Sequence, residues 1–261
     1  MMSTPTNDWD PALYLTFTDQ RLRPALDLMA RVPLAKAATV HDLGCGPGNV
    51  TRLLAERWPA ARVTGIDASP EMLAKARAIP TITWQQADLA RWRATAPADL
   101  VYSNAALHWL DDHAQLFPHL VDQLRPGGVL AVQMPRQHLN PTHRILFDLA
   151  REPRWGGSPE AGIREFPVAD PGQYYAWLTA TCDPLDIWEV EYLHVLEGDN
   201  AVLQWVMGSV ARPVLDKLAP ADHPAFLAAY GERLAATYPR RADGKTLLPF
   251  RRLFVVAQRR A

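Results

Sequence analysis

The residues from His41 to Gly48, His-Asp-Leu-Gly-Cys-Gly-Pro-Gly, place an acid beside three closely spaced glycines. Glycine adopts backbone conformations closed to other residues and lets a ligand approach the main chain. The dinucleotide pattern is G-x-G-x-x-G, but here the glycines follow G-x-G-x-G and position 49 is Asn. Asp42 precedes the first glycine, and a carboxylate there repels a pyrophosphate and attracts a cation. The pattern therefore favours S-adenosylmethionine, which carries a sulfonium and an ammonium group, over NAD.

More polar residues follow at the expected ends of the next strands. Asp67 lies 67 − 48 = 19 residues after Gly48, a spacing that suits an acceptor for ribose hydroxyls. Asp88 can accept from the adenine amino group, and Met72 offers a polarizable contact to the adenine face. Any one of these residues could instead be a helix cap or a core residue. The predicted cofactor-binding residues are Asp42, Gly44, Cys45, Gly46, Gly48, Asp67, Ala68, Met72, Asp88, Leu89, Asn104 and Ala105.

The elements that must position these residues alternate between strand and helix. Short β-branched runs predict strands at 38–43, 61–66, 81–86, 99–103 and 129–134. Helical patterns predict helices at 49–57, 70–78 and about 113–124, and Arg125 to Gly128 reads as a turn. Alternating units of this kind pair in parallel through right-handed crossovers. We expect an α/β fold with a doubly wound, mostly parallel sheet, Rossmann-like, whose ligand lies at the C-terminal strand ends.

The second half of the chain differs in pattern and predicts a helical cap inserted late in the fold. Helices are expected near 141–151, 172–181, 199–210 and 221–237, and strands at 186–196 and 246–258, the latter interrupted early by Pro249. We therefore expect a core at 1–135 with an N-terminal helical segment. A mainly helical substrate cap follows at 136–245, with one strand at about 186–196 that returns to the sheet. Residues 246–261 hold the final strand.

Composition excludes several classes of function. The 261 residues carry 27 basic and 28 acidic side chains, a net charge of −1. We therefore do not expect binding to nucleic acid or to an anionic membrane through a large positively charged surface. The two cysteines, Cys45 and Cys182, form neither a disulfide framework nor a zinc motif. The first residues show no secretory pattern, and no apolar run is long enough for a membrane span. We expect a monomeric cytoplasmic protein without a metal.

The glycine turn, Asp67, Asp88 and the stretch Leu124 to Gly128 resemble the motif series of the class I S-adenosylmethionine-dependent methyltransferases. The resemblance extends over nearly the whole chain to the trans-aconitate 2-methyltransferase family. The stretches that carry it are Asn7–Leu15, Arg57–Ala61, Leu116–Leu120, Val129–Pro135, Pro141–His143, Tyr174–Tyr175, Asp186–Trp188, Arg212–Pro213 and Arg252–Phe254. Where that family has an aromatic residue before Pro141, this chain has His138.

The resemblance implies esterification of one carboxylate of trans-aconitate, a small tricarboxylate. A carboxylate with a pKa near 4 is already a nucleophile at neutral pH, so no general base is needed, and we assign no catalytic residue beyond positioning. A trianion requires cations and hydroxyl donors, and arginine matches carboxylates bidentately. Candidate substrate contacts are Tyr14, Trp109, Tyr174, Tyr175, Arg212 and Arg252. The alternatives are solvated arginines and tyrosines that only pack.

Other readings remain open. His108 as a general base would suit a hydroxyl or amine acceptor, although a structural role is favoured for it. Another class I methyltransferase, acting on a carrier-bound malonyl group, another small carboxylate or a hydroxyl compound, would share every cofactor motif. DNA amino-methyltransferases have an Asn/Asp-Pro-Pro-aromatic loop, whereas this chain has Asn104-Ala105-Ala106-Leu107. A non-enzymatic nucleotide-binding module would use the same fold. The choice of carboxylate comes only from the resemblance.

Overall fold

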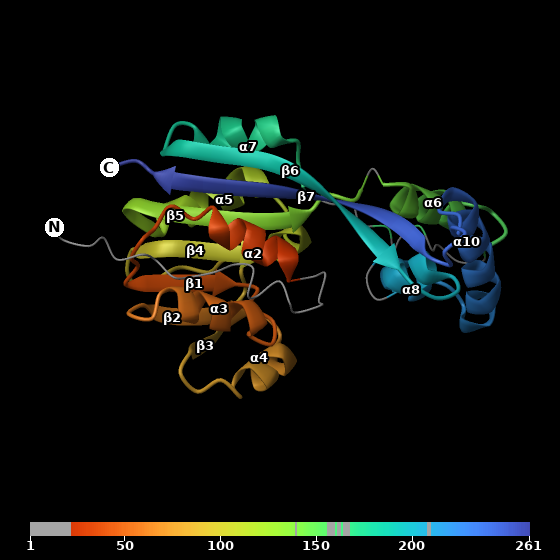
Figure 1. Cartoon of the computed structure of the whole chain (residues 1–261), viewed down its shortest axis with the longest axis horizontal. Helices are drawn as coiled ribbons and strands as arrows, with labels where there is room; N and C mark the ends of the chain where they lie inside the picture. Colours follow the sequence, from red (N-terminus) through yellow and green to blue (C-terminus); the bar gives the residue numbers. More distant parts are fainter. Residues whose placement is uncertain (1–21, 139, 156–159, 161–162, 164–167, 208–209) are drawn as a thin grey trace. The chain divides into compact units, whose positions relative to one another are not determined.

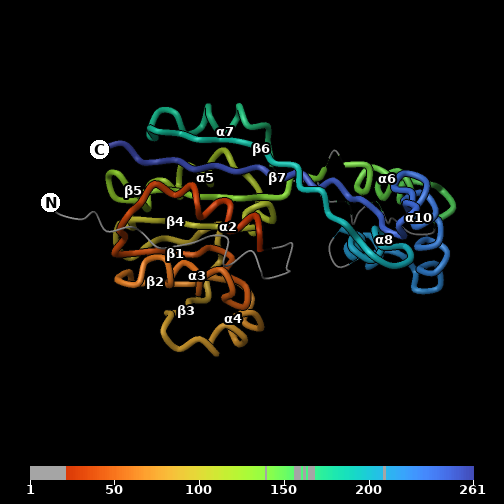
Figure 2. The backbone as a smooth tube through the Cα atoms, viewed as in Figure 1, coloured from red at the N-terminus to blue at the C-terminus, as the bar shows by residue number. Residues whose placement is uncertain are grey.

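The computed structural model describes residues 22–138, 140–155, 160, 163, 168–207 and 210–261 (Figures 1 and 2). The chain forms two compact units. The first takes the described residues of Met1–Pro135, Pro167–Glu189 and Leu253–Ala261, and the second takes those of Arg136–Phe166 and Val190–Arg252. Each unit has its own hydrophobic core. No helix within the described part of the chain is long and apolar enough to cross a membrane.

Five parallel strands of the first unit form the framework of the candidate site. They are β1 (Thr39–Leu43), β2 (Arg62–Asp67), β3 (Thr83–Gln86), β4 (Ala98–Asn104) and β5 (Leu124–Pro135). β1 pairs in parallel with β2 and β4, β2 pairs with β3, and β4 pairs with β5. The sheet runs β3-β2-β1-β4-β5 and continues with β7 (Thr246–Arg259) and β6 (Cys182–Leu196). The strand order reverses between β1 and β4, which is where open α/β sheets bind ligands.

The helices of the first unit are α2 (Arg23–Ala30), α3 (Asn49–Arg57), α4 (Pro70–Ala76), η1 (Leu107–Trp109), α5 (His113–Asp122) and α7 (Pro171–Leu178). Short-range signals set several of their ends. Ser69 Oγ accepts from the Met72 N–H and Pro70 opens α4, as an N-cap and a proline at the first helical position should. The predicted doubly wound α/β fold is confirmed.

Two local predictions were wrong. Arg125 to Gly128 is not a turn that ends before a strand at 129, because β5 already begins at Leu124. β4 pairs Ala98 with Leu124 and Leu100 with Val129, so β5 carries extra residues in a bulge, and Gly127 supplies the required positive φ of 74°. Pro249 does not interrupt β7. Although proline lacks an N–H, the Pro249 carbonyl accepts from Asn140 Nδ2 at 3.0 Å.

The second unit contains α6 (Pro141–Ala150), α8 (Ala201–Met207), α9 (Ala211–Leu215), η3 (Pro220–Asp222) and α10 (His223–Thr237), with parts of β6 and β7. Its core gathers Leu146, Val206, Phe226 and Leu234, and Trp155 packs edge-on against Phe226 at 5.0 Å. The described residues 168–189, which the sequence assigned to the cap, belong to the first compact unit. The boundaries of a substrate cap stay a prediction, because compactness alone does not identify a binding region.

Candidate functional site

The glycine turn joins β1 to α3 and requires glycine at each of its three positions. Gly44, Gly46 and Gly48 have φ values of 74°, 54° and 89°, a region that other residues seldom adopt. A Cβ at Gly44 would lie 2.1 Å from Ala106 Cβ, and one at Gly48 would lie 2.6 Å from the Trp84 ring. A Cβ at Gly46 would meet nothing within 4 Å. Two of the glycines therefore permit close packing, and Gly46 borders open space.

That open space is a cavity of about 280 Å³ at the C-terminal ends of β1 and β4. Of the predicted cofactor-binding residues, Asp42, Gly44, Cys45, Gly46 and Asn104 line it. Leu22, Pro47, Asn49 and Val50 complete the lining. The cavity lies at the reversal of strand order, where a doubly wound sheet is expected to bind a small ligand.

Asp42 is the acid that faces this cavity, and it is only 2% exposed. Thr51 Oγ1, in the first turn of α3, donates to Asp42 Oδ2 at 2.6 Å. Burial raises the pKa of Asp42 to about 7, the Thr51 hydrogen bond opposes this shift, and nearby Asp67 adds to it. Near neutral pH the carboxyl is therefore only partly ionised, and a cation in the cavity would favour its charged form.

We predict that this titration controls cofactor affinity. Ionised Asp42 attracts a cationic ligand, so binding should strengthen about tenfold as the pH rises from about 6 to about 8, through the carboxyl's own pKa. Calorimetric titration with S-adenosylmethionine at several pH values measures the slope. Asp42→Asn keeps the side-chain shape and leaves the ligand's own ionisation unchanged. Identical slopes for Asp42→Asn and the wild type would disprove the role of Asp42.

Asp67 ends β2 and fastens the glycine turn to the start of α4. Its Oδ2 accepts from the Gly46 N–H and its Oδ1 from the Ser69 N–H, both at 2.8 Å. The side chain is half-buried. Each carboxylate oxygen has more than one acceptor site, so a fixed Asp67 can still accept from two neighbouring hydroxyls of a ligand.

Asn104 ends β4 on the other side of the cavity. Its Oδ1 is buried and has no hydrogen-bond partner among the described residues. The next residue, Ala105, has a positive φ of 54°, and its N–H donates to the Gln133 carbonyl on β5 at 2.9 Å. A buried acceptor without a donor costs free energy, and an ammonium or other donor of a bound ligand would satisfy it. The cavity thus offers a carboxylate and an amide oxygen to one cationic ligand.

The remaining predicted cofactor residues surround the turn without lining the cavity. Leu89 is buried, Met72 is half-buried on the first turn of α4, and Ala68 is exposed. Asp88 is exposed, and its Oδ1 accepts from the Ala90 N–H at 3.0 Å. Their contacts with a cofactor stay predictions, as does the role of Gly48, which is buried against Trp84.

The structure separates the candidate substrate contacts into two groups. Trp109, Tyr174 and Tyr175 belong to the first unit, and Arg212 and Arg252 to the second. Trp109 is 44% exposed and Tyr175 is 56% exposed. Arg212 is exposed on α9, whereas Arg252 is 5% exposed with its guanidinium 4.6 Å from the Phe250 ring centroid. Tyr14 lies outside the described residues.

Tyr174 is fully buried in the core of the first unit. Its hydroxyl lies 2.7 Å from His113 Nδ1 and accepts from the Ala169 N–H at 3.2 Å. Its ring packs against Phe117 at 4.7 Å. This geometry favours packing, the alternative that the sequence left open, over substrate contact. His108 is also buried, and its ring lies 4.8 Å from that of Trp109.

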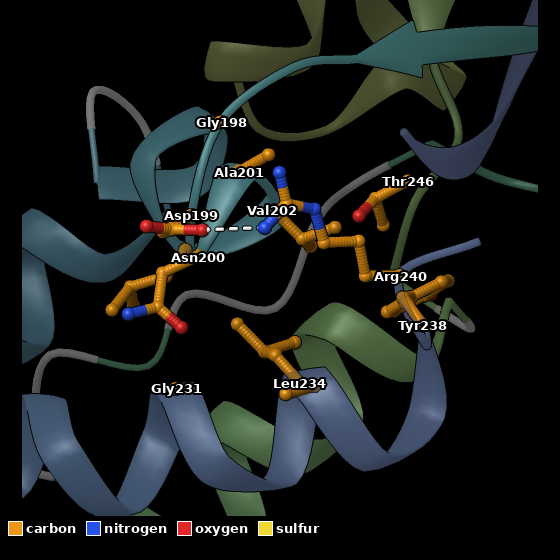
Figure 3. Close-up of a pocket in the computed structure, with 12 residues that line it drawn as sticks. Gly198, Asp199, Asn200, Ala201, Val202, Gly231, Leu234, Tyr238, Arg240 and Thr246 are labelled. Carbon is orange, nitrogen blue, oxygen red and sulfur yellow. Dashed lines mark hydrogen bonds and ion pairs between the residues drawn. The ribbon is translucent and has the colours of Figure 1, made fainter. Parts of the chain in front are cut away.

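A separate cavity of about 230 Å³ lies within the second unit, between the β6–α8 turn and α10 (Figure 3). Arg240 lines it, but this guanidinium donates to Asp199 Oδ1 and to the Gly244 carbonyl, both at 2.8 Å. Neither Arg212 nor Arg252 lines this cavity. The cavity therefore gives no support to the candidate substrate contacts.

Sequence reasoning missed three residues that shape the candidate site. Thr51 holds Asp42, Ala106 fills the space beside Gly44, and Trp84 covers Gly48 and Gly65. Thr51 carried a usable signal, because a hydroxyl in the first turn of the helix after the acid can reach back to it. Trp84 and Ala106 carried none, since both contacts depend on how separate strands are placed.

Comparison with known proteins assigns the chain to a family. The family model described as Methyltransferase domain matches residues 40–128. A trans-aconitate 2-methyltransferase of Azoarcus sp. (strain BH72) is 50% identical over 253 residues, covering 96% of this chain and 99% of that protein. Another, of Methylobacterium nodulans, is 48% identical over 97% of this chain and 98% of that protein. The chain belongs to the trans-aconitate 2-methyltransferase family.

Solved structures agree with the fold of this family member. Phosphoethanolamine N-methyltransferase 2 of Haemonchus contortus, solved with phosphomonomethylethanolamine and S-adenosylhomocysteine, is 15% identical with a TM-score of 0.54. The match covers 92% of this chain and 53% of that one. At this identity the likeness concerns the fold alone. The high identity to full-length family members, in contrast, spans both compact units.

Proposed function

We propose that this chain methylates a carboxylate of trans-aconitate with S-adenosylmethionine, giving the monomethyl ester. The observation that carries the proposal is the 50% identity over 96% of the chain to a protein named for this reaction. The match includes the second unit, which the Methyltransferase domain match at 40–128 does not reach. The proposal therefore rests on more than the shared cofactor motifs.

The cavity at β1 and β4 fits the proposed cofactor. S-Adenosylmethionine supplies an electrophilic methyl group on a positively charged sulfur. Asp42 and the Oδ1 of Asn104 would hold its positive groups, and Asp67 would accept from the ribose hydroxyls. The open side of Gly46 leaves room for close approach to the backbone. The wider predicted set, including Ala68, Met72, Asp88 and Leu89, belongs to the same proposal.

The protein's contribution to the reaction is positioning rather than proton transfer. A substrate carboxylate is ionised at neutral pH, so the oxygen can form its bond to the methyl carbon as the methyl–sulfur bond breaks. No proton leaves the acceptor, and the negative oxygen and positive sulfur are both neutralised. Holding the groups in line and excluding water would favour transfer. Arg252 and Arg212 are the proposed cations for the substrate, with Tyr14, Tyr175 and Trp109 as further contacts.

A panel of acids tests the proposed activity. The chain is incubated with S-adenosylmethionine and trans-aconitate, cis-aconitate, citrate or a carrier-bound malonyl group, and base-labile methyl esters are detected by mass spectrometry. We expect the ester from trans-aconitate. Ester formation only on the malonyl group would support the alternative substrate class. Cofactor binding without an ester from any tricarboxylate would contradict the proposed substrate. The position of the ester on the product shows which carboxylate reacts.

We predict that Arg252→Ala raises the KM for trans-aconitate by about tenfold or more, as expected for a lost charge-assisted contact of about 1.5–3 kcal/mol. The KM for S-adenosylmethionine should change by less than about twofold, because the substitution removes no proposed contact with this cofactor. Steady-state kinetics with each substrate varied in turn measures the two effects.

Arg251→Ala is the matched control for this prediction. Arg251 is the neighbouring residue, lies on the opposite face of β7, is exposed, and pairs with Glu191 at 3.7 Å. Its loss should leave both KM values nearly unchanged. Equal effects of Arg252→Ala on both KM values, or none, would return Arg252 to a purely structural role beside Phe250.

The location and assembly of the protein belong to this proposal as well. We propose a cytoplasmic enzyme that acts on a small molecule as a monomer. Size-exclusion chromatography with light scattering tests the monomer, and cell fractionation tests the location.

A further inference from the structure

A second polar cavity lies on the sheet of the first unit, away from the glycine turn. Its volume is about 250 Å³. Parallel strands are commonly joined by a helix, but the described residues 87–97 between β3 and β4 contain none. The sheet contributes residues at alternate positions of β1, β2 and β3 to the cavity lining. Side chains two residues apart on a strand point to the same face of the sheet. The contributed residues are Thr39, His41, Arg62, Thr64, Thr83 and Gln85.

The sheet side chains that line the cavity are polar. Only His41 and Thr64 among them are buried, whereas Arg62, Thr83 and Gln85 are exposed, so this face of the sheet is covered only in part. Strands buried on both faces of a parallel sheet tend to be continuously hydrophobic. Here His41 is opposite Thr64 and Thr64 is opposite Thr83 in the strand register. Adjacent strands lie about 4.8 Å apart, so an imidazole and two hydroxyls form a row across three strands. Such a row can contact several oxygen atoms of one small molecule.

Two buried polar atoms in this cavity have no hydrogen-bond partner among the described residues. They are His41 Nδ1 and Trp92 Nε1, in side chains that are 8% and 3% exposed. The two rings meet edge-on at 5.0 Å, and both residues line the cavity. Buried polar groups are nearly always hydrogen-bonded. A ligand in the cavity would satisfy both atoms.

The loop that carries Trp92 is hydrogen-bonded to α5 and to Gln123, the residue that follows this helix. His119 Nε2 lies 2.8 Å from the Trp92 carbonyl. Gln123 Oε1 accepts from the Ala94 N–H at 3.1 Å, and Gln123 Nε2 donates to the His119 carbonyl at 2.9 Å. The cavity is thus bounded by a loop with fixed backbone contacts on one side and by three paired strands on the other.

The charged residues that line the cavity are both arginines. Arg62 on β2 and Arg93 in the loop are both exposed, and among the residues that the structure describes no acid lines this cavity. Burial, followed by the charge of Arg62, lowers the pKa of His41 to about 4, so the imidazole is neutral near pH 7. Two guanidinium groups, hydroxyl donors and an indole N–H match the acceptor oxygens of an anion.

We propose that this cavity is a second small-molecule site, which binds a carboxylate or phosphate oxyanion through Arg62, Arg93 and the row of His41, Thr64 and Thr83. The site is separate from the cavity of Asp42 and Asn104, and none of its lining residues is shared with it. It requires neither the proposed methyl transfer nor the proposed substrate contacts. Its oxyanion could come from a carboxylic acid or from a phosphate.

NMR titration of the full chain tests the site. The indole N–H signal of Trp92 is assigned by its loss in Trp92→Phe. Inorganic phosphate and citrate are then added separately at constant ionic strength, with chloride as the reference anion. We expect a saturable shift of the Trp92 signal with phosphate, citrate or both, and only a small shift with chloride. The response to phosphate against citrate distinguishes the two sources of the oxyanion.

Variants distinguish anion binding in this cavity from anion binding elsewhere on the protein. The double variant Arg62→Gln/Arg93→Gln should bind the anion more weakly, because charge-assisted contacts are lost. The dissociation constant measured at Trp92 should rise about tenfold or more. Arg77→Gln removes an exposed positive charge outside the cavity and should leave the constant unchanged. Arg252→Ala should also retain the Trp92 response. No saturable shift with either anion, or equal affinity in the double variant and the wild type, would overturn the proposal.

Discussion

Asp67→Ala is expected to weaken binding of S-adenosylmethionine and S-adenosylhomocysteine about 100-fold or more, the equivalent of about 3 kcal/mol. Asp67 holds the N–H groups of Gly46 and Ser69 and is the proposed acceptor for the ribose hydroxyls. Hydrogen bonds to charged groups contribute about 1.5–3 kcal/mol each, so two such losses account for the effect. Isothermal titration calorimetry measures it, with thermal unfolding to show that the fold persists.

Asp67→Asn and a modified ligand separate the two roles of this carboxylate. Asparagine retains one acceptor oxygen and should lose about tenfold, an intermediate effect. The 2′-deoxy form of S-adenosylhomocysteine should bind the wild type more weakly than the parent compound. Asp67→Ala should bind both ligands with equal affinity, because the carboxylate that contacts the 2′-hydroxyl is gone. If Asp67→Ala still distinguished the two ligands, Asp67 would act only on the loop. Unchanged affinity for the parent compound would remove Asp67 from the site altogether.

The residues that the sequence predicts well are those with short-range signals. The turn from Asp42 to Gly48 depends on backbone conformation and neighbouring charge, both of which are visible in a few consecutive residues. The helix start at Ser69 and Pro70 is another such case, because the Ser69 hydroxyl accepts from the Met72 N–H three residues later. In contrast, Gly127 permits a positive φ in a turn or in a bulge, and only the pairing of β5 with β4 decides between them.

The electrostatics of the candidate site depend on packing that the sequence does not contain. Asp42 was predicted as a simple negative charge, but burial changes its ionisation near neutral pH. Tyr174 resembled a hydroxyl donor, but its hydroxyl faces His113 inside the core. In both cases the residue type was read correctly, and its environment, set by residues distant in sequence, determined what that residue can do.

Gly44→Ala is expected to destabilise the fold by more than the usual penalty for a side chain in the left-handed region, which is about 1–2 kcal/mol. The new Cβ would also lie 2.1 Å from Ala106 Cβ, so the turn or the segment after β4 must shift. Because Asp42 and Asn104 flank this contact on the two strands, cofactor affinity should fall as well. Urea unfolding and calorimetry measure stability and affinity separately.

Two variants divide the effect of Gly44→Ala into its parts. Ala106→Gly in the Gly44→Ala background removes the clash but keeps the backbone strain, so stability should recover until about 1–2 kcal/mol remains lost. Gly46→Ala carries similar strain at φ 54° without a steric contact, and its methyl group projects into open space beside the cavity. It should therefore reduce affinity more than stability. No recovery with Ala106→Gly would show that the turn of β1 and the segment after β4 are not packed as described, and the geometry proposed for the cofactor would have to be abandoned.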